Sequence, residues 1–301
     1  MRKVLKWIGI ILGALVGLLL LAVAVVYVIS SIRFNRTYDI QFEAVVIPTD
    51  EASIEYGEHV AAIRSCMACQ VIPVAGQIEF EDPTVGRIAN AILTSGEGGI
   101  GAAYRDEDWV RAIRHGLTPD GKPILIMPAH TMFPMSDEDL GAVIAYVKSI
   151  PPVNKERLPV SLSLLPRLMF VAGQMDFLVP AELIDHDSPR PAAPARGVTA
   201  EYGEYLAGLC TLCHGLGFSG GPIPGTPPSD PPASNLTPAG RLQFWTVDDF
   251  IIAMRTGKTP GGLQLRDEFM PYPVFVDMTD DELDAIWLYL LSLPPTEYGN
   301  R

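Results

Sequence analysis

The chain has 301 residues, of which 48% are hydrophobic and 19% charged, so it can form folded domains and is not a disordered tail. Its formal net charge is −13, from 22 basic and 35 acidic residues. A surface of that sign repels nucleic acid, which argues against a nucleic-acid-binding protein. It would attract a basic protein partner, although the same charge also serves solubility alone.

The first predicted element is a membrane-spanning helix over residues 7–29, an uninterrupted apolar run. Its 23 residues, at about 1.5 Å each, extend roughly 35 Å, which is enough to cross a hydrocarbon core. Arg2, Lys3 and Lys6 precede the run, and basic residues mark the cytoplasmic side of a membrane helix. We therefore expect residues 1–6 in the cytoplasm, a single span in a bacterial cytoplasmic membrane, and everything after it on the periplasmic side.

A cleaved signal peptide is the alternative interpretation of this segment. Ala22-Val23-Ala24 resembles a small-residue cleavage site, and cleavage there would release a soluble protein that starts at Val25. The apolar stretch continues to Ile29, however, where a signal peptide would already be polar. This continuation favours an uncleaved anchor.

The remainder of the chain contains two copies of one unit. Matching residues lie 143 positions apart near the end of each copy and 141 positions apart in the middle. The matched segments are 56–58 with 202–204, 108–116 with 249–257, and 127–152 with 270–295. A series of matches in the same order indicates a duplication. We therefore predict a first domain over residues 50–152, a linker over 153–197 and a second domain over 198–301.

Each unit is predicted to be helical. Capping-box pairs open three apolar-periodic runs: Ser136 with Asp139, Thr246 with Asp249, and Thr279 with Glu282. Helices are expected over residues 54–65, 106–115, 137–149, 200–209, 247–256 and 280–291. The stretches between them are rich in glycine and proline and show no alternating strand pattern, so the predicted fold class is all-α. Within the linker, residues 164–178 predict a helix packed between the units rather than a second span, because charges and a proline interrupt them.

The second unit carries the motif Cys210-Thr211-Leu212-Cys213-His214, and C-x-x-C-H is a signal for c-type haem attachment. Two thiols one helical turn apart bond to the porphyrin vinyl groups, and the next side chain, His214, is then placed to bind the iron. Zinc would require both C-x-x-C pairs of the chain at one site, and a thioredoxin-like redox pair would require a strand–helix context. Neither pattern is present, so we predict haem c.

The second axial ligand is predicted to be Met270, in a Met-Pro loop before the last helix. A thioether stabilises ferrous iron and raises the reduction potential, which suits an electron carrier. The alternative is that Met270 only fills space in the core, as methionines often do, and that Met278 takes its place.

The first unit departs from this pattern. Its pair Cys66-Met67-Ala68-Cys69 is followed by Gln70, whose amide is a poor ligand for haem iron compared with imidazole. Met127 occupies the place that Met270 holds in the second unit. Three histidines of this unit could replace the missing ligand: His59, His115 and His130. Of these, His115 is expected to be solvated at a helix end. We predict one haem per chain, in the second unit, with two as the alternative.

On these residues the sequence resembles the class I cytochrome c family in tandem form. It looks like the membrane-anchored, two-domain cytochromes related to cytochrome subunits of periplasmic dehydrogenases. The segments that carry the resemblance are residues 202–204, 210–214, 235–238, 270–271 and 280–283. It implies an all-α fold whose first and last helices cross over the haem. It also implies thioether bonds at Cys210 and Cys213, with His214 and Met270 as iron ligands, whereas in the first unit only Cys66, Cys69 and Met127 match.

The predicted function is electron transfer on the periplasmic side of the membrane rather than catalysis by this chain. The expected partners are redox proteins, either basic carriers or a membrane oxidoreductase complex. The alternative is a haem-containing subunit of a periplasmic oxidoreductase, dehydrogenase or peroxidase-like, in which the first unit is a haemless docking module. A peroxidase-like enzyme would need an open iron position, which Met270 would close.

Overall fold

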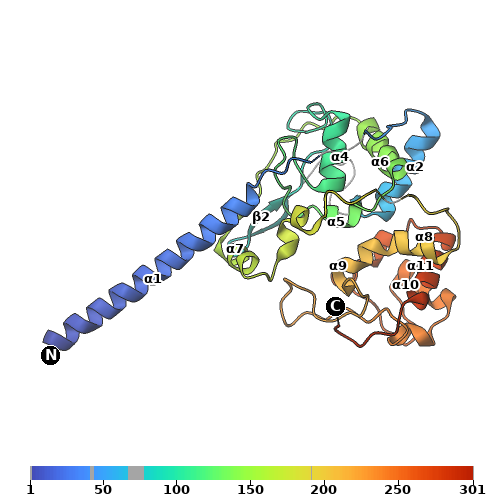
Figure 1. The fold of residues 1–301 in the computed structure, drawn as a ribbon. Coiled ribbons are helices and arrows are strands. Elements are labelled where there is room, and N and C mark those ends of the chain that lie inside the picture. Colours follow the sequence, from blue (N-terminus) through green and yellow to red (C-terminus); the bar gives the residue numbers. More distant parts are fainter. Residues whose placement is uncertain (1, 41–43, 67–77, 191, 301) are drawn as a thin grey trace.

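The computed structural model describes residues 2–40, 44–66, 78–190 and 192–300. The described part is mostly helical, and a long N-terminal helix leads away from two compact units (Figure 1). Cys69 and Gln70 of the first unit lie outside the described residues.

The N-terminal helix α1 (Arg2–Phe34) contains the whole predicted span and continues for five residues beyond it. Among the described residues, it is the one helix that is long and apolar enough to cross a membrane. Most of its side chains are exposed, including the leucines and isoleucines of its middle part. An apolar helix of this length with an uncovered apolar surface fits a membrane anchor.

The helices of the two units follow the prediction closely. The first unit contains α2 (Glu51–Ile63), α4 (Asp106–His115), α5 (Ala129–Met132) and α6 (Asp137–Ser149). The second contains α8 (Ala200–Ala207), α9 (Thr211–His214), α10 (Val247–Thr256) and α11 (Asp280–Ser292). Short 3-10 helices cover Gly208–Cys210, Arg241–Phe244 and Tyr272–Phe275. The helix expected over residues 200–209 therefore tightens into a 3-10 turn from Gly208 onward.

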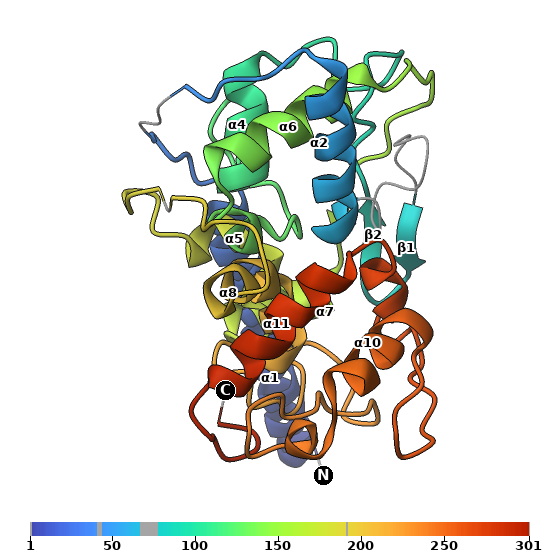
Figure 2. The same ribbon diagram turned by 90° about the vertical axis from the view of Figure 1, so that its right-hand side faces the viewer.

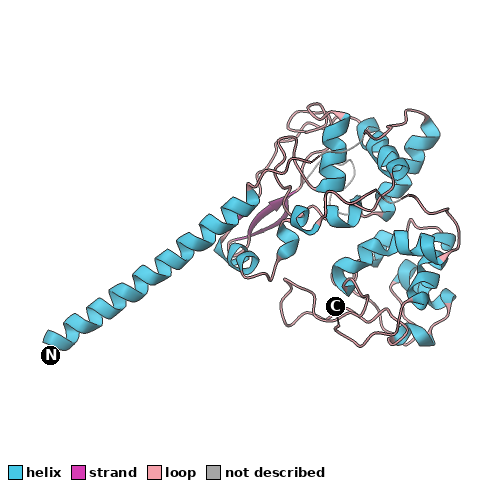
Figure 3. Ribbon diagram, in the orientation of Figure 1, coloured by secondary structure: helices cyan, strands magenta, loops and turns pink. Residues whose placement is uncertain are grey.

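The all-α prediction is wrong in one place, a small antiparallel sheet shown in magenta in Figure 3. Its strands are β1 (Ile78–Asp82), β2 (Gly86–Ala89) and β3 (Ser161–Leu162), in the order β1-β2-β3. β3 comes from the linker and pairs with β2 at Gly86, where any side chain would collide with the Ser161 carbonyl. Strands this short carry too little alternation to be recognised in a sequence.

The first and last helices of each unit cross at a glycine. In the first unit α2 packs on α6, and Gly57 lies against the carbonyl group of Ala142. In the second unit α8 packs on α11, and Gly203 lies in the same way against Ala285 (Figure 2). A β-carbon at either glycine would overlap the facing carbonyl oxygen, so only glycine allows the two backbones to approach this closely.

Gly203→Ala is therefore expected to destabilise the protein strongly. Overpacking at a rigid backbone contact costs about 3 kcal/mol, which corresponds to a fall in the melting temperature of roughly 12–24 °C for a unit of this size. Thermal unfolding followed by circular dichroism measures it. Gly208→Ala is the matched control, because its β-carbon would lie 3.9 Å from the nearest atom, the carbonyl oxygen of Thr131. Equal melting temperatures for the two variants would contradict the described crossing.

The duplication is also visible in the details of the two units. Arg114 forms an ion pair with Asp137 at 2.8 Å. The corresponding pair in the second unit, Arg255 with Asp280, has a separation of 3.0 Å. The loops after α4 and α10 close with matching bridges, Leu117–Pro123 and Lys258–Gln264. The two copies of the repeat therefore share local structure as well as sequence.

The helix expected between the units lies elsewhere. Within residues 164–178 the helix is α7 (Leu164–Val171), and it packs against the end of α1 (Figure 1). Its one charged side chain, Arg167, donates to the Ser30 hydroxyl at 2.9 Å. The ring of Phe170 lies 5.1 Å from that of Phe34. The prediction that this helix packs between the units is therefore wrong, because Arg167 and Phe170 both contact residues of α1. Two 3-10 helices, Asp176–Leu178 and Pro180–Leu183, follow it.

The two units contact each other reciprocally. His59 of α2 contacts the Glu282 carboxylate, near the start of α11, at 2.8 Å. Tyr205 of α8 donates a hydrogen bond to Asp139, near the start of α6, at 2.5 Å. Tyr205 and His59 occupy equivalent positions, because each directly follows the Tyr-Gly-Glu segment of its own unit. Asp139 and Glu282 correspond in the repeat. The units therefore exchange equivalent contacts, as the two halves of a twofold dimer do.

This exchange changes one of the predicted capping boxes. Those at Thr246 and Thr279 are complete. Ser136 accepts a hydrogen bond from the backbone of Asp139 at 3.1 Å, but its own N–H donates to the Tyr205 hydroxyl at 3.0 Å. The carboxylate of Asp139 is thereby released from the cap and bonds across the interface.

The His59–Glu282 contact should stabilise the chain over a limited pH window. The hydrogen bond with Glu282 raises the pKa of His59, Asp277 adds to this rise, and burial and Arg196 oppose it. Burial alone would raise the pKa of Glu282, but its hydrogen bonds with His59 and with the backbone of Thr279 outweigh this and lower the pKa. The histidine contribution is complete below its unfolded pKa of about 6.5 and is lost as the pH rises through the raised value. The glutamate contribution is lost as the pH falls through its lowered value.

His59→Gln is accordingly expected to lower the melting temperature most between about pH 4.5 and 6.5, where both partners are charged. A half-buried ion pair contributes on the order of 1 kcal/mol, or about 3 °C in a chain of this length. Melting curves of the wild type and the variant across the pH range measure the difference. A difference that does not shrink toward pH 8 would show that charge plays no part in the contact.

Candidate haem site

The C-x-x-C-H motif lies on a helical path that continues from α8. The 3-10 turn Gly208–Cys210 leads directly into α9, so Cys210 and Cys213 stand one turn apart. The path ends at Gly215, whose φ of 78° is one that glycine adopts readily and other residues seldom do. The sequence around the motif thus produces the local geometry that two thioether bonds and an adjacent ligand require.

His214 is buried, with 6% of its surface exposed, and its ring is held by the backbone. Its Nδ1 lies 2.7 Å from the carbonyl oxygen of Ser234. A carbonyl group can only accept, so this contact selects the tautomer with the proton on Nδ1 and the lone pair on Nε2. Such a hydrogen bond orients a metal-binding imidazole and increases its basicity. The imidazole therefore fits the role of a ligand to haem iron.

Zinc is the alternative to haem at Cys210 and Cys213. Burial, with a smaller effect of the neighbouring Cys213, raises the pKa of Cys210 to about 12, so this thiol is protonated at neutral pH. Within the described ranges, no group of three or more histidine, cysteine or acidic side chains is arranged to hold a metal ion. The described residues therefore supply no third and fourth zinc ligand to Cys210 and Cys213.

The methionines of each unit fall into two kinds. Met278 is 2% exposed inside the core of the second unit, and its counterpart Met135 is 1% exposed in the first. Met270 is only partly buried and packs at the edge of the core that also contacts Cys210. The loops that hold Met270 and Met127 have the same local hydrogen bond of 2.6 Å, from the backbone N–H two residues later. This arrangement favours Met270 over Met278 as the ligand.

The polar side chains of Asn235 and Thr237 form hydrogen bonds within the protein. The Asn235 side chain accepts from the backbone and the hydroxyl of Thr237, at 2.8 and 2.7 Å, and donates to the Thr296 carbonyl at 2.8 Å. These polar groups hold the segment at Thr296 against residues 235–237.

The candidate histidines of the first unit are placed differently from one another. His59 contacts Glu282, as described above. His115 is 3% exposed, and its Nδ1 lies 2.9 Å from Nδ1 of His186, so the expectation that it is solvated is wrong. Burial, followed by the neighbouring His186, lowers the pKa of His115 to about 3. His130 lies three residues after Met127, and its Nδ1 is buried without a hydrogen-bond partner in the described structure.

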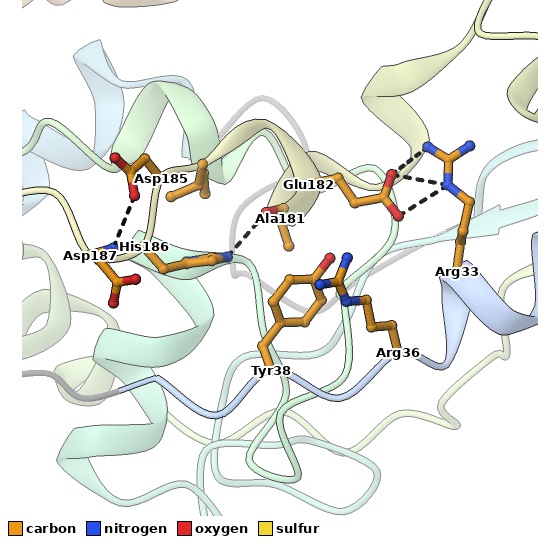
Figure 4. A pocket seen from close by; sticks show the side chains of 9 residues that line it. Arg33, Arg36, Tyr38, Ala181, Glu182, Asp185, His186 and Asp187 are labelled. Carbon is orange, nitrogen blue, oxygen red and sulfur yellow. Dashed lines mark hydrogen bonds and ion pairs between the residues drawn. The ribbon is translucent and has the colours of Figure 1, made fainter.

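His186 joins this part of the first unit to the end of the anchor. Its Nε2 lies 3.1 Å from the Ala181 carbonyl oxygen, in a pocket at the C-terminal end of α1 (Figure 4). Arg33 on the same side is bonded to both carboxylate oxygens of Glu182. The pocket has charges of both signs, and its lining residues hold the linker against the anchor.

Comparison with known proteins decides the nature of the second unit. Residues 200–294 match the family model of cytochrome c. The second unit is a cytochrome c domain. Its covalently bound cofactor is therefore haem c, as the C-x-x-C-H motif predicted.

The chain is also similar over most of its length to cytochrome subunits of dehydrogenases. The cytochrome c subunit of alcohol dehydrogenase (quinone) from Gluconacetobacter polyoxogenes is 29% identical over 280 residues, covering 82% of this chain and 57% of the relative. The same subunit from Gluconobacter oxydans (strain 621H) is 27% identical over 282 residues, covering 84% and 57%. The gluconate 2-dehydrogenase cytochrome c subunit from Pantoea cypripedii is 28% identical over 282 residues, covering 81% and 60%.

These similarities confirm the resemblance to dehydrogenase cytochrome subunits. The chain spans less than two thirds of the length of these curated relatives. The family model matches the second unit, whereas the pairwise similarity covers more than four fifths of the chain.

Proposed function

We propose that this chain carries electrons through a haem attached to Cys210 and Cys213, as the electron-transfer subunit of a membrane-bound dehydrogenase. The observation that carries the proposal is the buried His214, held by the Ser234 carbonyl directly beside the two cysteines. Haem iron supplies a reversible one-electron change between its ferric and ferrous states. The related subunits belong to quinone-dependent alcohol dehydrogenases and to gluconate 2-dehydrogenase.

In this proposal the protein orients the ligands and keeps water from the iron. His214 is the proximal ligand and Met270 the distal one. The buried cluster of the second unit, with Phe250 packed against Trp287 at 5.6 Å between ring centres, provides an apolar surround. Two protein ligands leave no position for a substrate, so the chain passes electrons between partners and does not catalyse a reaction itself.

The first unit, residues 50–152, is proposed to be a second cytochrome c-like domain that has lost its haem and serves as a docking module. Its crossing glycine, its Arg114–Asp137 ion pair and its Met127 loop all repeat those of the second unit. In the alternative with a second haem, Cys66 and Cys69 are its attachment sites and Met127 is a ligand.

The chain is proposed to be a single-pass protein of the bacterial cytoplasmic membrane with both units on the periplasmic side. Arg2, Lys3 and Lys6 support this orientation. Arg33 at the other end is neutralised by Glu182, which weakens its opposing effect. An intact mass that starts at Met1 checks the anchor, and a start at Val25 would contradict it. The net charge of −13 supports a basic partner surface, either on a soluble carrier or within the dehydrogenase complex.

Carbon monoxide and peroxide separate an electron carrier from a peroxidase-like enzyme. The reduced wild-type protein is expected to keep its absorption spectrum under carbon monoxide, and the oxidised protein to be unaffected by peroxide, because both iron positions are taken. A pyridine haemochrome spectrum of the c type identifies the cofactor in the same sample. Rapid formation of a carbon monoxide adduct would show an open position and favour the oxidoreductase alternative.

A further inference from the structure

The exposed side of α7 is apolar. Leu165 and Leu168 are each 48% exposed, whereas Pro166 and Phe170 are buried. The single charged side chain, Arg167, contacts the hydroxyl groups of Ser30 and Ser31 on α1, at 2.9 and 3.3 Å. A surface helix of a water-soluble domain would direct its leucines inward and its arginine outward. α7 does the reverse.

α7 is also held at a definite level along the anchor. The guanidinium group of Arg167 lies 4.9 Å from the ring centre of Tyr27. Tyr27 is 20 residues past Trp7, or about 30 Å along a helix, which is the thickness of a hydrocarbon core. Val26 and Ser30 are buried, although most of α1 is exposed. The protein therefore covers one side of α1, at Val26, Ser30 and Phe34, from about the level at which a span beginning at Trp7 would leave the hydrocarbon.

We propose that α7 lies in the interfacial layer of the bilayer that α1 crosses, with Leu165 and Leu168 among the acyl chains. Helices with an apolar face occupy this layer, and tyrosine and arginine are the side chains that favour its depth. A chain of net charge −13 is repelled by anionic headgroups, so this side of the protein needs an apolar contact with the acyl chains to lie against the membrane. The contact would fix the orientation of both units above the membrane.

This inference rests on the proposed membrane anchoring, and photocrosslinking tests the two separately. A p-benzoylphenylalanine residue replaces Leu168, Leu12 or Leu288 in the full-length chain, one position at a time. Leu12 is an exposed residue in the middle of α1, and Leu288 is an exposed residue of α11. Helix α11 belongs to the second unit and lies away from α1 (Figure 1). Each protein is reconstituted into vesicles of phosphatidylethanolamine and labelled phosphatidylglycerol and then irradiated. Circular dichroism reports that each variant is folded.

Lipid adducts are expected at positions 12 and 168, at several times the level found at position 288. An adduct at position 12 without one at position 168 overturns the placement of α7 and leaves the anchor intact. A crosslink from position 168 to a second copy of the chain also overturns it, since protein would then cover the leucines. Failure at position 12 as well contradicts the anchor itself, while the proposed electron transfer would stand.

Discussion

Replacing Met270 with alanine is expected to remove the weak sulfur-to-iron absorption band from the ferric spectrum, to lower the reduction potential and to open the iron to small ligands. A thioether ligand favours ferrous iron, so its loss favours the ferric form. The expected fall is roughly 0.1–0.3 V, part of the span of about 0.8 V that axial ligands control. Redox titration and absorption spectra with and without carbon monoxide measure these effects.

Two other methionines serve as controls for this prediction. Met127→Ala changes the equivalent loop of the first unit and should leave the spectrum unchanged if only the second unit carries haem. Met278→Ala removes a fully buried side chain, so it should cost about 2–5 kcal/mol of stability but keep the band. Loss of the band in Met278→Ala, with Met270→Ala unchanged, would assign the ligand to Met278 and contradict the proposal.

The helices could be predicted because their signals are local. Thr279 and Glu282 cap the start of α11 within four residues, and Gly257 ends α10 in the left-handed conformation. Such residues act on the backbone beside them, so they have the same meaning in a sequence as in a fold. The C-x-x-C-H motif is local in the same sense, which is why five consecutive residues are enough to propose the attachment site.

The features that could not be predicted depend on contacts between distant segments. Strand β3 has two residues, and it is a strand only because Gly86 gives it a partner. Arg167 would be expected to face water, yet it faces the serines of α1. The sequence likewise explains Asp139 as part of a helix cap, whereas in the structure it accepts a hydrogen bond from Tyr205, which is 66 residues away. No periodicity within one segment carries this information.

The wild-type chain is expected to contain one covalent haem, and the Gln70→His variant two. Attachment to a C-x-x-C pair places the iron over the following residue, where the second unit has His214 and the first has Gln70. An amide is a poor ligand for this iron, so haem should not be retained there. The first unit otherwise keeps the helix crossing at Gly57 and the Met127 loop that the cofactor would require. Intact mass together with haem quantitation measures the number of haems in each protein.

Gln70→Asn is the matched control, because it keeps an amide and should leave one haem. The histidines of the first unit limit the ways in which the wild type could hold two. His59 contacts Glu282, and His115 contacts His186 inside the protein, so a replacement ligand would have to come at the expense of these contacts. His130, three residues after Met127, has a buried Nδ1 without a hydrogen-bond partner in the described structure and is the better candidate. If the wild type contains two haems and His130→Ala contains one, the first unit binds haem and His130 is its ligand, which would contradict the proposal. If the wild type and Gln70→His each contain one haem, something more than the missing imidazole prevents attachment to the first unit.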